Sequence, residues 1–376
     1  MPEDLSGMFE ATSLPLGDDV PGPVEPERRP GRSHLGSAIN AGLVVLAFAL
    51  LGLVLWRNRE KISQVFSHPL DYRLLGLGIL IFQLSLIVTY VRWYLLVRVI
   101  EPRFKLRSTM LLGSIGYVFN QVIPGAVGGD LIKAAYLVRM HIRKTQAVAS
   151  MIIDRIVGLI GLFVLATIAG AVFWGSAPVE IRRLIVAAWI ATGAGFLLLV
   201  AVLFGVFTRM ARSRTSEGEA QGHGKLAGIA TELRSMSSTY RTRLDVVAAG
   251  ILLSMIGHSL NVLAFYLMSR MLFLDSLPTT LGQHFLMVPL TLFTMVVPLP
   301  FGALGLSEGV SDQIGNLVDH PGGALAMLGF RVLMYACGLI SACVYLANIR
   351  EVKGLSAEAH HLEEEIEDGT VGDEVP

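Results

Sequence analysis

Long apolar runs separated by short polar segments dominate the sequence. A helix needs about 20 predominantly apolar residues to cross a bilayer. Six stretches meet that requirement, and each predicts a spanning helix. They are residues 38–56, 72–97, 146–174, 184–208, 244–270 and 322–348. This pattern is typical of an all-α polytopic membrane protein.

Two further apolar regions are interrupted where a spanning helix would have to be continuous. Residues 109–140 are broken by the sequence IPGAVGGD, and residues 280–320 are broken by prolines and a glycine-rich turn. Each region is long enough for two half-helices with a turn between them. Irregular backbone at membrane depth occurs only where it is buried in protein or lines a water-filled cavity. We therefore expect two re-entrant helical hairpins.

The two interrupted regions share a motif. The first carries it as Pro124, Gly128, Gly129 and Asp130, and the second carries it as Pro300, Gly302, Gly305 and Glu308. An arginine follows each motif inside the next apolar run, as Arg155 and Arg331. Both arginines lie about nine residues inside a predicted helix, roughly 13 Å deep at 1.5 Å per residue. A helix, a hairpin and a helix therefore recur, which predicts an inverted repeat of the kind found in many transporters.

The positions of Lys and Arg predict the orientation, because short cytoplasmic loops are enriched in both. Loop 209–243 and segments 98–107 and 139–144 are basic, whereas residues 299–321 contain neither Lys nor Arg. We expect both termini and loop 209–243 on the cytoplasmic side of a bacterial-type inner membrane, with 299–321 outside. The basic segment 57–73 opposes this assignment, but the longer central loop outweighs it.

Composition agrees with the membrane class. Hydrophobic residues make up 53% of the chain and charged residues 16%, and the mean hydropathy is +0.60. Residues 1–37 predict a disordered tail and residues 351–376 an acidic tail. The two cysteines share one apolar run and give no zinc or haem spacing. We expect no cofactor, no bound metal and no nucleic-acid partner.

Five ionisable residues fall at membrane depth, where a charge is costly and is by default a functional candidate. They are Asp130, Asp154, Arg155, Glu308 and Arg331. The alternative is that they pair with one another only to lock helices together. The motif glycines also have two explanations. They leave N–H groups at a helix start that attract anions, or they let helices pack closely. Arg92 and Trp93 near the end of 72–97 predict ordinary interfacial anchors.

The stretch NQVIPGAVGGDLIKAAYLVRM and the following AVASMIIDRIVGLIGL resemble the signature of the lysylphosphatidylglycerol synthase transmembrane family, also called the flippase-like domain family. The later PLPFGALGLSE resembles the second element of that signature. The resemblance covers most of residues 38–350. Lys133 and Asp154 stand where the family usually has Arg and Glu. The charges are kept, but a lysine cannot bind phosphate in the bidentate manner of arginine.

The resemblance implies a flippase or transporter that moves a phospholipid or a glycosylated lipid carrier with an anionic or zwitterionic headgroup. The residues it implies for substrate binding are Asn120, Pro124, Gly128, Gly129, Asp130, Lys133, Asp154, Arg155, Pro300, Gly302, Gly305, Glu308 and Arg331. Some family members are joined to an aminoacyltransferase or follow a glycosyltransferase domain. We expect neither in this chain, so synthase activity is not carried over and enzymatic activity stays open.

Two alternatives remain at this point. One is a membrane-embedded lipid-phosphate enzyme in which Asp130 and Glu308 are metal ligands. The other is a non-catalytic scaffold for a cell-envelope synthase, so that a separate lipid-modifying synthase would be the partner. The sequence contains no Walker-type nucleotide motif, so a driving force would come from a gradient or from downstream consumption of the lipid.

Overall fold

The computed structural model describes residues 34–67, 69–122, 128–204, 239–273, 279–297, 299–320 and 322–348. All regular secondary structure in these ranges is helical. The chain divides into two units, Met1–Ala41 and Gly42–Pro376. Only the opening of helix α1, His34–Arg57, is described from the first unit. Every contact discussed below lies within the second unit. Residues 1–33 of the expected N-terminal tail, the expected C-terminal tail and most of the loop 209–243 fall outside the described residues.

Within the described residues, five helices are long and apolar enough to cross a membrane. They are α3 Tyr72–Ile100, α6 Lys144–Phe173, α7 Val179–Leu203, α10 Leu244–Phe273 and α14 Gly323–Ala347. The sequence predicts six. The remaining segment, 38–56, lies in α1, whose apolar stretch Gly42–Arg57 belongs to the shorter apolar helices. The all-helical membrane architecture is therefore confirmed, and a sixth span through α1 stays a prediction.

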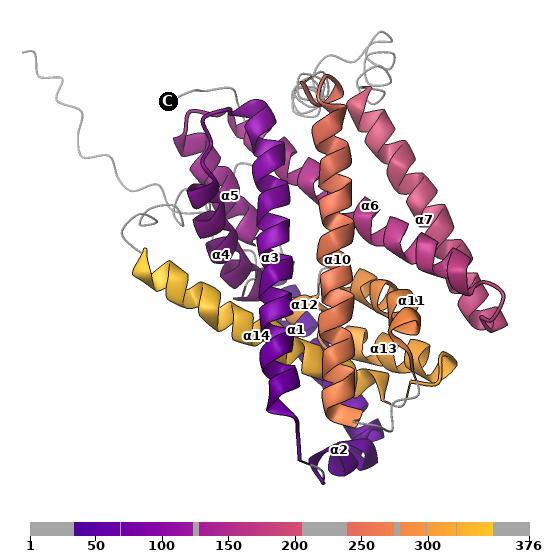
Figure 1. The fold of residues 1–376 in the computed structure, drawn as a ribbon. Coiled ribbons are helices and arrows are strands. Elements are labelled where there is room, and N and C mark those ends of the chain that lie inside the picture. The colour runs from indigo at the N-terminus through magenta and orange to yellow at the C-terminus, as the bar shows by residue number, and fades with distance from the viewer. Residues whose placement is uncertain are drawn as a thin grey trace, which may run out of the picture. The chain divides into compact units, whose positions relative to one another are not determined.

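Helices α3 and α10 pack side by side and antiparallel, as Figure 1 shows. The Ser85 hydroxyl of α3 donates a hydrogen bond to the Gly257 carbonyl of α10 at 3.0 Å. Further along the pair, a Cβ atom on Gly78 would come within 3.0 Å of Met268. Small residues at these positions let the two backbones approach closely, which is the usual basis of helix association in membranes.

The first interrupted region forms two helices, α4 Leu106–Val122 and α5 Gly128–Arg139, which pack against each other. This is the pair of half-helices predicted for 109–140. The turn between them, which includes Pro124, lies outside the described residues. Buried apolar side chains of α4 and α5 form one core cluster together with Trp93 of α3. The hairpin therefore docks on α3 through its own apolar face.

The second interrupted region is more broken, as its prolines and glycines predict. It contains α11 Leu281–Leu292, a 3₁₀ turn Phe293–Val296, the one-turn α12 Pro300–Ala303 and α13 Leu306–Leu317. Thr280 caps α11 through a reciprocal pair of hydrogen bonds with Gln283. Phe301, Gly302 and Ala303 within α12 have positive φ, and so does Gly305 between α12 and α13. Two half-helices joined by an irregular turn match the prediction for 280–320.

The two hairpins lie beside opposite halves of the α3–α10 pair (Figure 1). Helix α14, which follows the second hairpin, packs on α4 of the first. Helix α6, which follows the first hairpin, packs on α11 of the second. Each hairpin also packs on the helix that comes directly after it. A short helix, α2 Arg59–Phe66, reaches α13 through an ion pair of Lys61 with Asp312 at 3.7 Å.

Candidate functional site

Three groups of opposite charges lie within the apolar helices and hairpins of the described residues. The first cluster is Asp130 with Lys133 and Arg155, the second cluster is Glu308 with Arg331, and the third cluster is Arg92 with Asp154. Each of the five ionisable residues singled out from the sequence belongs to one of them. The three clusters differ sharply in exposure and in how fully their hydrogen-bonding groups are used.

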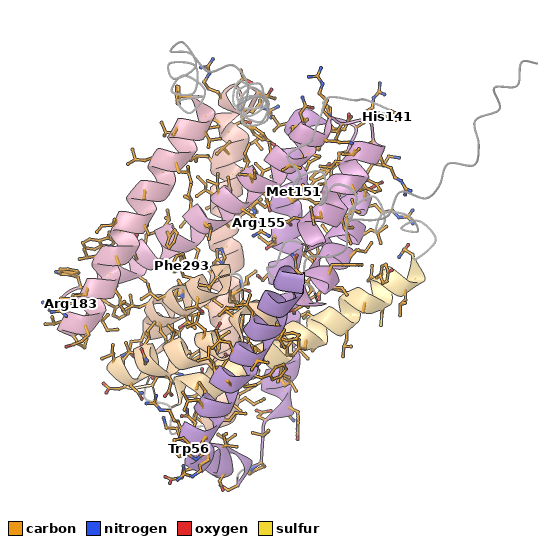
Figure 2. The ribbon with its side chains drawn as sticks, turned by 180° about the vertical axis from the view of Figure 1, so that it is seen from behind. Trp56, His141, Met151, Arg155, Arg183 and Phe293 are labelled. Atoms are coloured by element: carbon orange, nitrogen blue, oxygen red, sulfur yellow. The ribbon has the colours of Figure 1, made fainter. Side chains whose placement is uncertain are left out.

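The first cluster joins the start of α5 to the middle of α6. Arg155 donates from Nε to Asp130 Oδ2 at 2.6 Å, and Lys133 Nζ lies 3.4 Å from Asp130 Oδ1. The side chain of Arg155 is 48% exposed, whereas that of Asp130 is 16% exposed. Figure 2 labels Arg155 partway along α6. The Asp130 carboxylate therefore forms ion pairs with both Lys133 and Arg155, and the side chain of Arg155 is the exposed one.

Lys133 is held by packing as well as by charge. A Cβ atom on Gly116 of α4 would lie 3.0 Å from Lys133 Cε, so the lysine stem fills the space that this glycine leaves. Its Nζ lies 5.1 Å from the centroid of the Trp93 ring, a cation–π distance. Trp93 is 1% exposed. The prediction that Trp93 is an interfacial anchor is therefore wrong, because the ring is buried beneath the lysine and the first hairpin.

Gly129 at the start of α5 and Asn120 near the end of α4 connect the two helices of the first hairpin. The Gly129 N–H donates to Asn120 Oδ1 at 2.8 Å. A Cβ atom on Gly129 would lie 2.0 Å from the carbonyl oxygen of Gly116, a backbone atom that cannot rotate away. Close packing is therefore the role of Gly129, and its N–H group is used inside the protein. Gly128 is the first residue of α5.

Gly129→Ala should lower the stability of the folded protein, because the added methyl group must push α4 and α5 apart. Overpacking of this kind costs about 1–3 kcal/mol in a tightly packed site. Thermal unfolding of the purified protein in detergent would measure the loss. Gly193→Ala in α7 is the matched control, because a Cβ atom there meets nothing within 4 Å. Equal melting temperatures for the two variants would contradict the tight α4–α5 contact.

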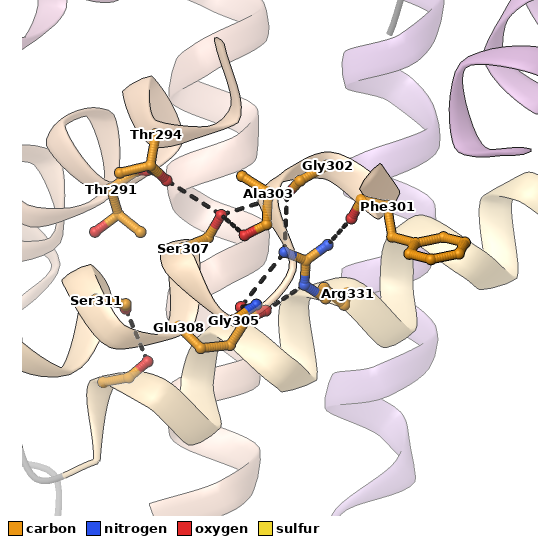
Figure 3. A network of polar contacts seen from close by, with 11 residues as sticks. Thr291, Thr294, Phe301, Gly302, Ala303, Gly305, Ser307, Glu308, Ser311 and Arg331 are labelled. Atoms are coloured by element: carbon orange, nitrogen blue, oxygen red, sulfur yellow. Dashed lines mark hydrogen bonds and ion pairs between the residues drawn. The ribbon is translucent and has the colours of Figure 1, made fainter. Parts of the chain in front are cut away.

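The second cluster is fully enclosed, and Figure 3 shows its network of polar contacts. Glu308 is 0% exposed and the Arg331 side chain 3%. Arg331 Nε donates to Glu308 Oε1, Nη1 donates to the Phe301 carbonyl at 2.6 Å, and Nη2 donates to the Gly302 carbonyl at 2.9 Å. Glu308 Oε2 accepts from the Gly305 N–H at 2.6 Å. The carboxylate of Glu308 thus lies against the start of α13, where the sequence suggested that an anion would bind.

The turn that Arg331 holds is conformationally costly. Phe301 and Ala303 both have φ of 55°, and Gly302 has φ of 63°. A left-handed conformation costs a residue other than glycine about 1–2 kcal/mol. Gly305 has φ of 83°, and a Cβ atom there would lie 2.5 Å from Cβ of Leu50. The guanidinium of Arg331 offsets part of this cost by donating to two of the turn's carbonyls.

The third cluster corrects the prediction made for Arg92. Arg92 makes a bidentate ion pair with Asp154, with Nε–Oδ1 at 2.9 Å and Nη2–Oδ2 at 3.0 Å. Its Nη1 donates to the Ser254 hydroxyl at 3.0 Å. Arg92 is buried and is not an interfacial anchor. Asp154 therefore neutralises Arg92 rather than the arginine beside it, because adjacent residues on α6 point in different directions.

A sequence signal for the third cluster did exist. Helix α3 runs to Ile100, so Arg92 lies well inside it rather than at its end. Arg92 also follows Ser85 by two turns and precedes Leu96 by one, and all three residues are buried. That spacing places Arg92 on the face of α3 that packs against other helices. A buried arginine on such a face requires an acidic partner.

The first hairpin meets the helix that carries Arg331. Tyr117 Oη donates to the Met334 carbonyl at 3.1 Å, and Gln121 Nε2 lies 3.4 Å from the same carbonyl. Met334 follows Arg331 by about one helical turn. Helix α12 also packs against α4. The end of α4 is therefore near the second cluster.

Two prolines belong to the predicted site. Pro124 lies outside the described residues, and Pro300 is described only as the first residue of α12. Among the described positions, no group of three or more His, Cys, Asp or Glu side chains could hold a metal ion. Asp130 and Glu308, the acids of the metal-dependent alternative, each form an ion pair with an arginine instead.

Comparison with known proteins gives one family. A family model described as "Lysylphosphatidylglycerol synthase TM region" matches residues 35–342. No curated protein matches the sequence. The matched range contains all three charge clusters and both hairpins, and it confirms the resemblance seen in the sequence.

Proposed function

The chain belongs to the lysylphosphatidylglycerol synthase TM region family and is a multi-pass integral membrane protein, and from this premise we propose that it moves a lipid with a charged headgroup across the bilayer. The lipid is a phospholipid or a glycosylated lipid carrier. The first cluster is the proposed headgroup site, and the second and third clusters hold the surrounding helices in place.

The observation that carries this proposal is the exposure of Arg155 at depth. Arg155 lies nine residues after Gln146, where the apolar span begins, or about 13 Å along the helix. Almost half of its side chain is exposed there. An arginine at the centre of a membrane helix costs about 2.5–3.5 kcal/mol even on insertion scales. A hydrated headgroup beside the guanidinium would remove that cost, whereas lipid tails would not.

The chemistry of the first cluster suits a phosphate group. A guanidinium offers a planar fork of N–H donors, and an ammonium offers a compact point charge. The Arg155 guanidinium and the Lys133 ammonium both lie beside the Asp130 carboxylate. Asp130 holds Arg155 through a charge-assisted hydrogen bond at 2.6 Å. Asp130 therefore acts as the group that orients the arginine. The enclosed Arg331 has its donors committed to Glu308 and to two carbonyls, so we assign it no direct headgroup contact in this conformation.

The packing of the helices supports an inverted repeat. The closing helix of each half packs on the hairpin of the other half, as α14 does on α4 and α6 on α11. The opening helices of the two halves, α3 and α10, run antiparallel beside each other (Figure 1). When two similar units are related by a two-fold axis in the membrane plane, each unit is expected to make the same contacts with the other. Movement of one half against the other would then carry a headgroup across.

Reconstitution into vesicles tests the proposal. Vesicles that hold the protein and a lipid labelled with a fluorophore on its headgroup would be treated with an impermeant quencher. Protein-mediated movement should bleach the inner-leaflet label as well, whereas protein-free vesicles should keep about half of the signal under the same conditions. A plateau identical to that of protein-free vesicles, for every lipid offered, would count against a transporter.

Orientation gives a separate prediction. Single cysteines at positions Ser213 and Gln313 should be labelled from opposite sides of the membrane, because basic segments favour the cytoplasm and 299–321 has no Lys or Arg. Gln313 is exposed on α13, whereas its neighbour Asp312 pairs with Lys61. The native Cys337 and Cys343 would first be replaced by serine. Labelling of both sites from the same side would contradict the inverted arrangement.

A further inference from the structure

We propose that His284 and His320 form a proton-binding site inside the second hairpin, and that proton uptake there separates α11 from the connection between α13 and α14. The inference goes beyond the proposed function, because neither histidine belongs to the three charge clusters. The ligand is a proton from water, which forms a bond to an imidazole nitrogen. The argument comes from the hydrogen bonds, the burial and the surroundings of the two rings.

The two imidazoles come from different segments and pack against each other. His284 lies in the first turn of α11, and His320 lies in the connection between α13 and α14. Their ring centroids are 5.1 Å apart, and the rings make an angle of 69°. The residues are 0% and 1% exposed. This enclosed pair is therefore a direct contact between α11 and the segment that follows α13.

His284 has a lone pair that the fold leaves unused. Its Nδ1 lies 2.8 Å from the Thr280 carbonyl oxygen, which can only accept, so Nδ1 carries the hydrogen of the neutral ring. The Nε2 atom is then an acceptor, and it has no hydrogen-bond partner within the described residues. A buried polar atom without a partner is rare in folded proteins. Nε2 of His284 is therefore the first atom of the pair that would take up a proton.

His320 brings a second free nitrogen to the same place. Its Nε2 lies 3.1 Å from the Ser269 hydroxyl of α10, and its Nδ1 has no hydrogen-bond partner in the described part of the chain. A hydroxyl can donate or accept, so either tautomer of His320 satisfies this contact. Burial lowers the pKa of His320, and the neighbouring His284 lowers it further. The enclosed arrangement therefore favours the neutral form of His320.

The surroundings do not balance a positive charge on the pair. The charged residues nearest to it along the surrounding elements are Lys61 of α2, Arg270 of α10, Asp312 of α13 and Asp319 of the connection. Lys61 pairs with Asp312 at 3.7 Å, and its Cδ would lie 3.5 Å from a Cβ atom on Gly322. None of the described acids forms an ion pair with either histidine. A proton on the pair would therefore be an enclosed charge, and Lys61 would repel it.

The connection between α13 and α14 is the segment that such a charge would displace. Asp319 has φ of 56° and Gly322 has φ of 86°. A left-handed conformation at a residue other than glycine persists only where the surroundings hold it in place. An enclosed charge without a partner is far less favourable than the same charge in water. Protonation therefore favours an arrangement in which the contact between the two rings opens and water reaches them.

Distances between two spin labels at different pH values test the opening. The labels would be attached to the purified full chain at Leu281 of α11 and Gln313 of α13, which are both exposed, after serine has replaced Cys337 and Cys343. Double electron–electron resonance would be recorded from about pH 7.5 to about pH 4.5, a range that includes the ordinary histidine pKa of about 6.5. A longer distance should appear as the pH falls, with a midpoint below about 6.5, because burial opposes proton uptake.

Two substitutions remove the titrating rings and keep their existing hydrogen bonds. His284→Asn keeps an N–H group that can donate to the Thr280 carbonyl, and His320→Gln keeps an amide that can reach the Ser269 hydroxyl. The double variant should show the same distances at both ends of the pH range. His141→Asn, at an exposed position between α5 and α6, is the matched control and should respond to pH as the unsubstituted protein does.

Solid-state NMR of the wild type with isotope-labelled histidine measures proton uptake without the double variant. The signal of a bare imidazole nitrogen, assigned to His284 by its loss in His284→Asn, should change to that of a protonated nitrogen over the pH range of the distance change. Imidazole nitrogens that stay bare down to about pH 4.5 would overturn the inference. Distances that do not change with pH, or a full pH response in the double variant, would overturn it too. None of these results concerns lipid movement, so the proposed function would still stand.

Discussion

Arg155→Ala should strongly slow lipid movement while the protein still accumulates and folds. Arg155 is half exposed, so its loss leaves no large cavity, and Asp130 keeps a contact with Lys133. The lost interaction with the headgroup is a charge-assisted hydrogen bond, about 1.5–3 kcal/mol. That range corresponds to a loss of about 10- to 150-fold in transport rate or headgroup affinity. The vesicle bleaching assay measures the rate, and size-exclusion chromatography in detergent measures the folded yield.

Two companion variants sharpen the result. Arg155→Lys keeps the charge but loses the planar fork of donors, so it should retain only part of the activity. Arg183→Ala removes an exposed arginine near the start of α7 and should leave transport unchanged. Transport by Arg155→Ala at the wild-type rate would contradict a headgroup role. Failure of Arg155→Ala to accumulate would instead show that the arginine is needed for the fold.

The spanning helices and the hairpins were predictable because their signals are local. A run of about 20 apolar residues can satisfy its backbone in hydrocarbon only as a helix. Proline and glycine at 298–305 cannot continue such a helix, and the described residues 300–305 form an irregular turn with positive φ at Gly302 and Gly305. The start of the chain was less predictable. The apolar stretch Gly42–Arg57 falls among the shorter helices, so a sixth span rests on sequence alone.

The partners of the charges were only partly predictable. Pairing of these charges with one another was one of the two explanations that the sequence allowed, and Asp130 with Arg155 and Glu308 with Arg331 do form ion pairs. The partner of Asp154 was not foreseen. It depends on the rotation of α6 and on how far α3 extends, and neither follows from a run of apolar residues. The Trp93 ring beneath Lys133 was missed for the same reason, because its burial is set by the docking of the first hairpin.

The sequence also could not show that the two matched arginines differ in environment. Their spacing after the two motifs is nearly the same, so it predicts the same role for both. In the structure, Arg155 is half exposed, whereas Arg331 is enclosed and bound to two carbonyls of a left-handed turn. Exposure depends on what packs over a side chain from distant parts of the chain. Here the turn 300–305 lies between Arg331 and α1, since Gly305 contacts Leu50.

Arg331→Met should therefore lower the stability of the protein far more than Arg155→Met. The substitution leaves Glu308 fully buried with no cation, and it removes the donors that hold the Phe301 and Gly302 carbonyls. Breaking a buried ion pair by removing one partner costs about 3–5 kcal/mol. Unfolding of the purified variants by a denaturing detergent in mixed micelles would measure the difference in free energy of unfolding.

The double variant Glu308→Gln with Arg331→Met should recover part of that loss. Glutamine has no charge to leave unpaired, and its side-chain oxygen can still accept the Gly305 N–H that Glu308 now accepts. Recovery would be incomplete, because the two turn carbonyls still lack their donor. A cost for Arg331→Met no larger than that for Arg155→Met would contradict the closed second cluster. A double variant less stable than Arg331→Met alone would show that the carboxylate of Glu308 stabilises the turn even without its arginine. It would do so by accepting the Gly305 N–H at the start of α13.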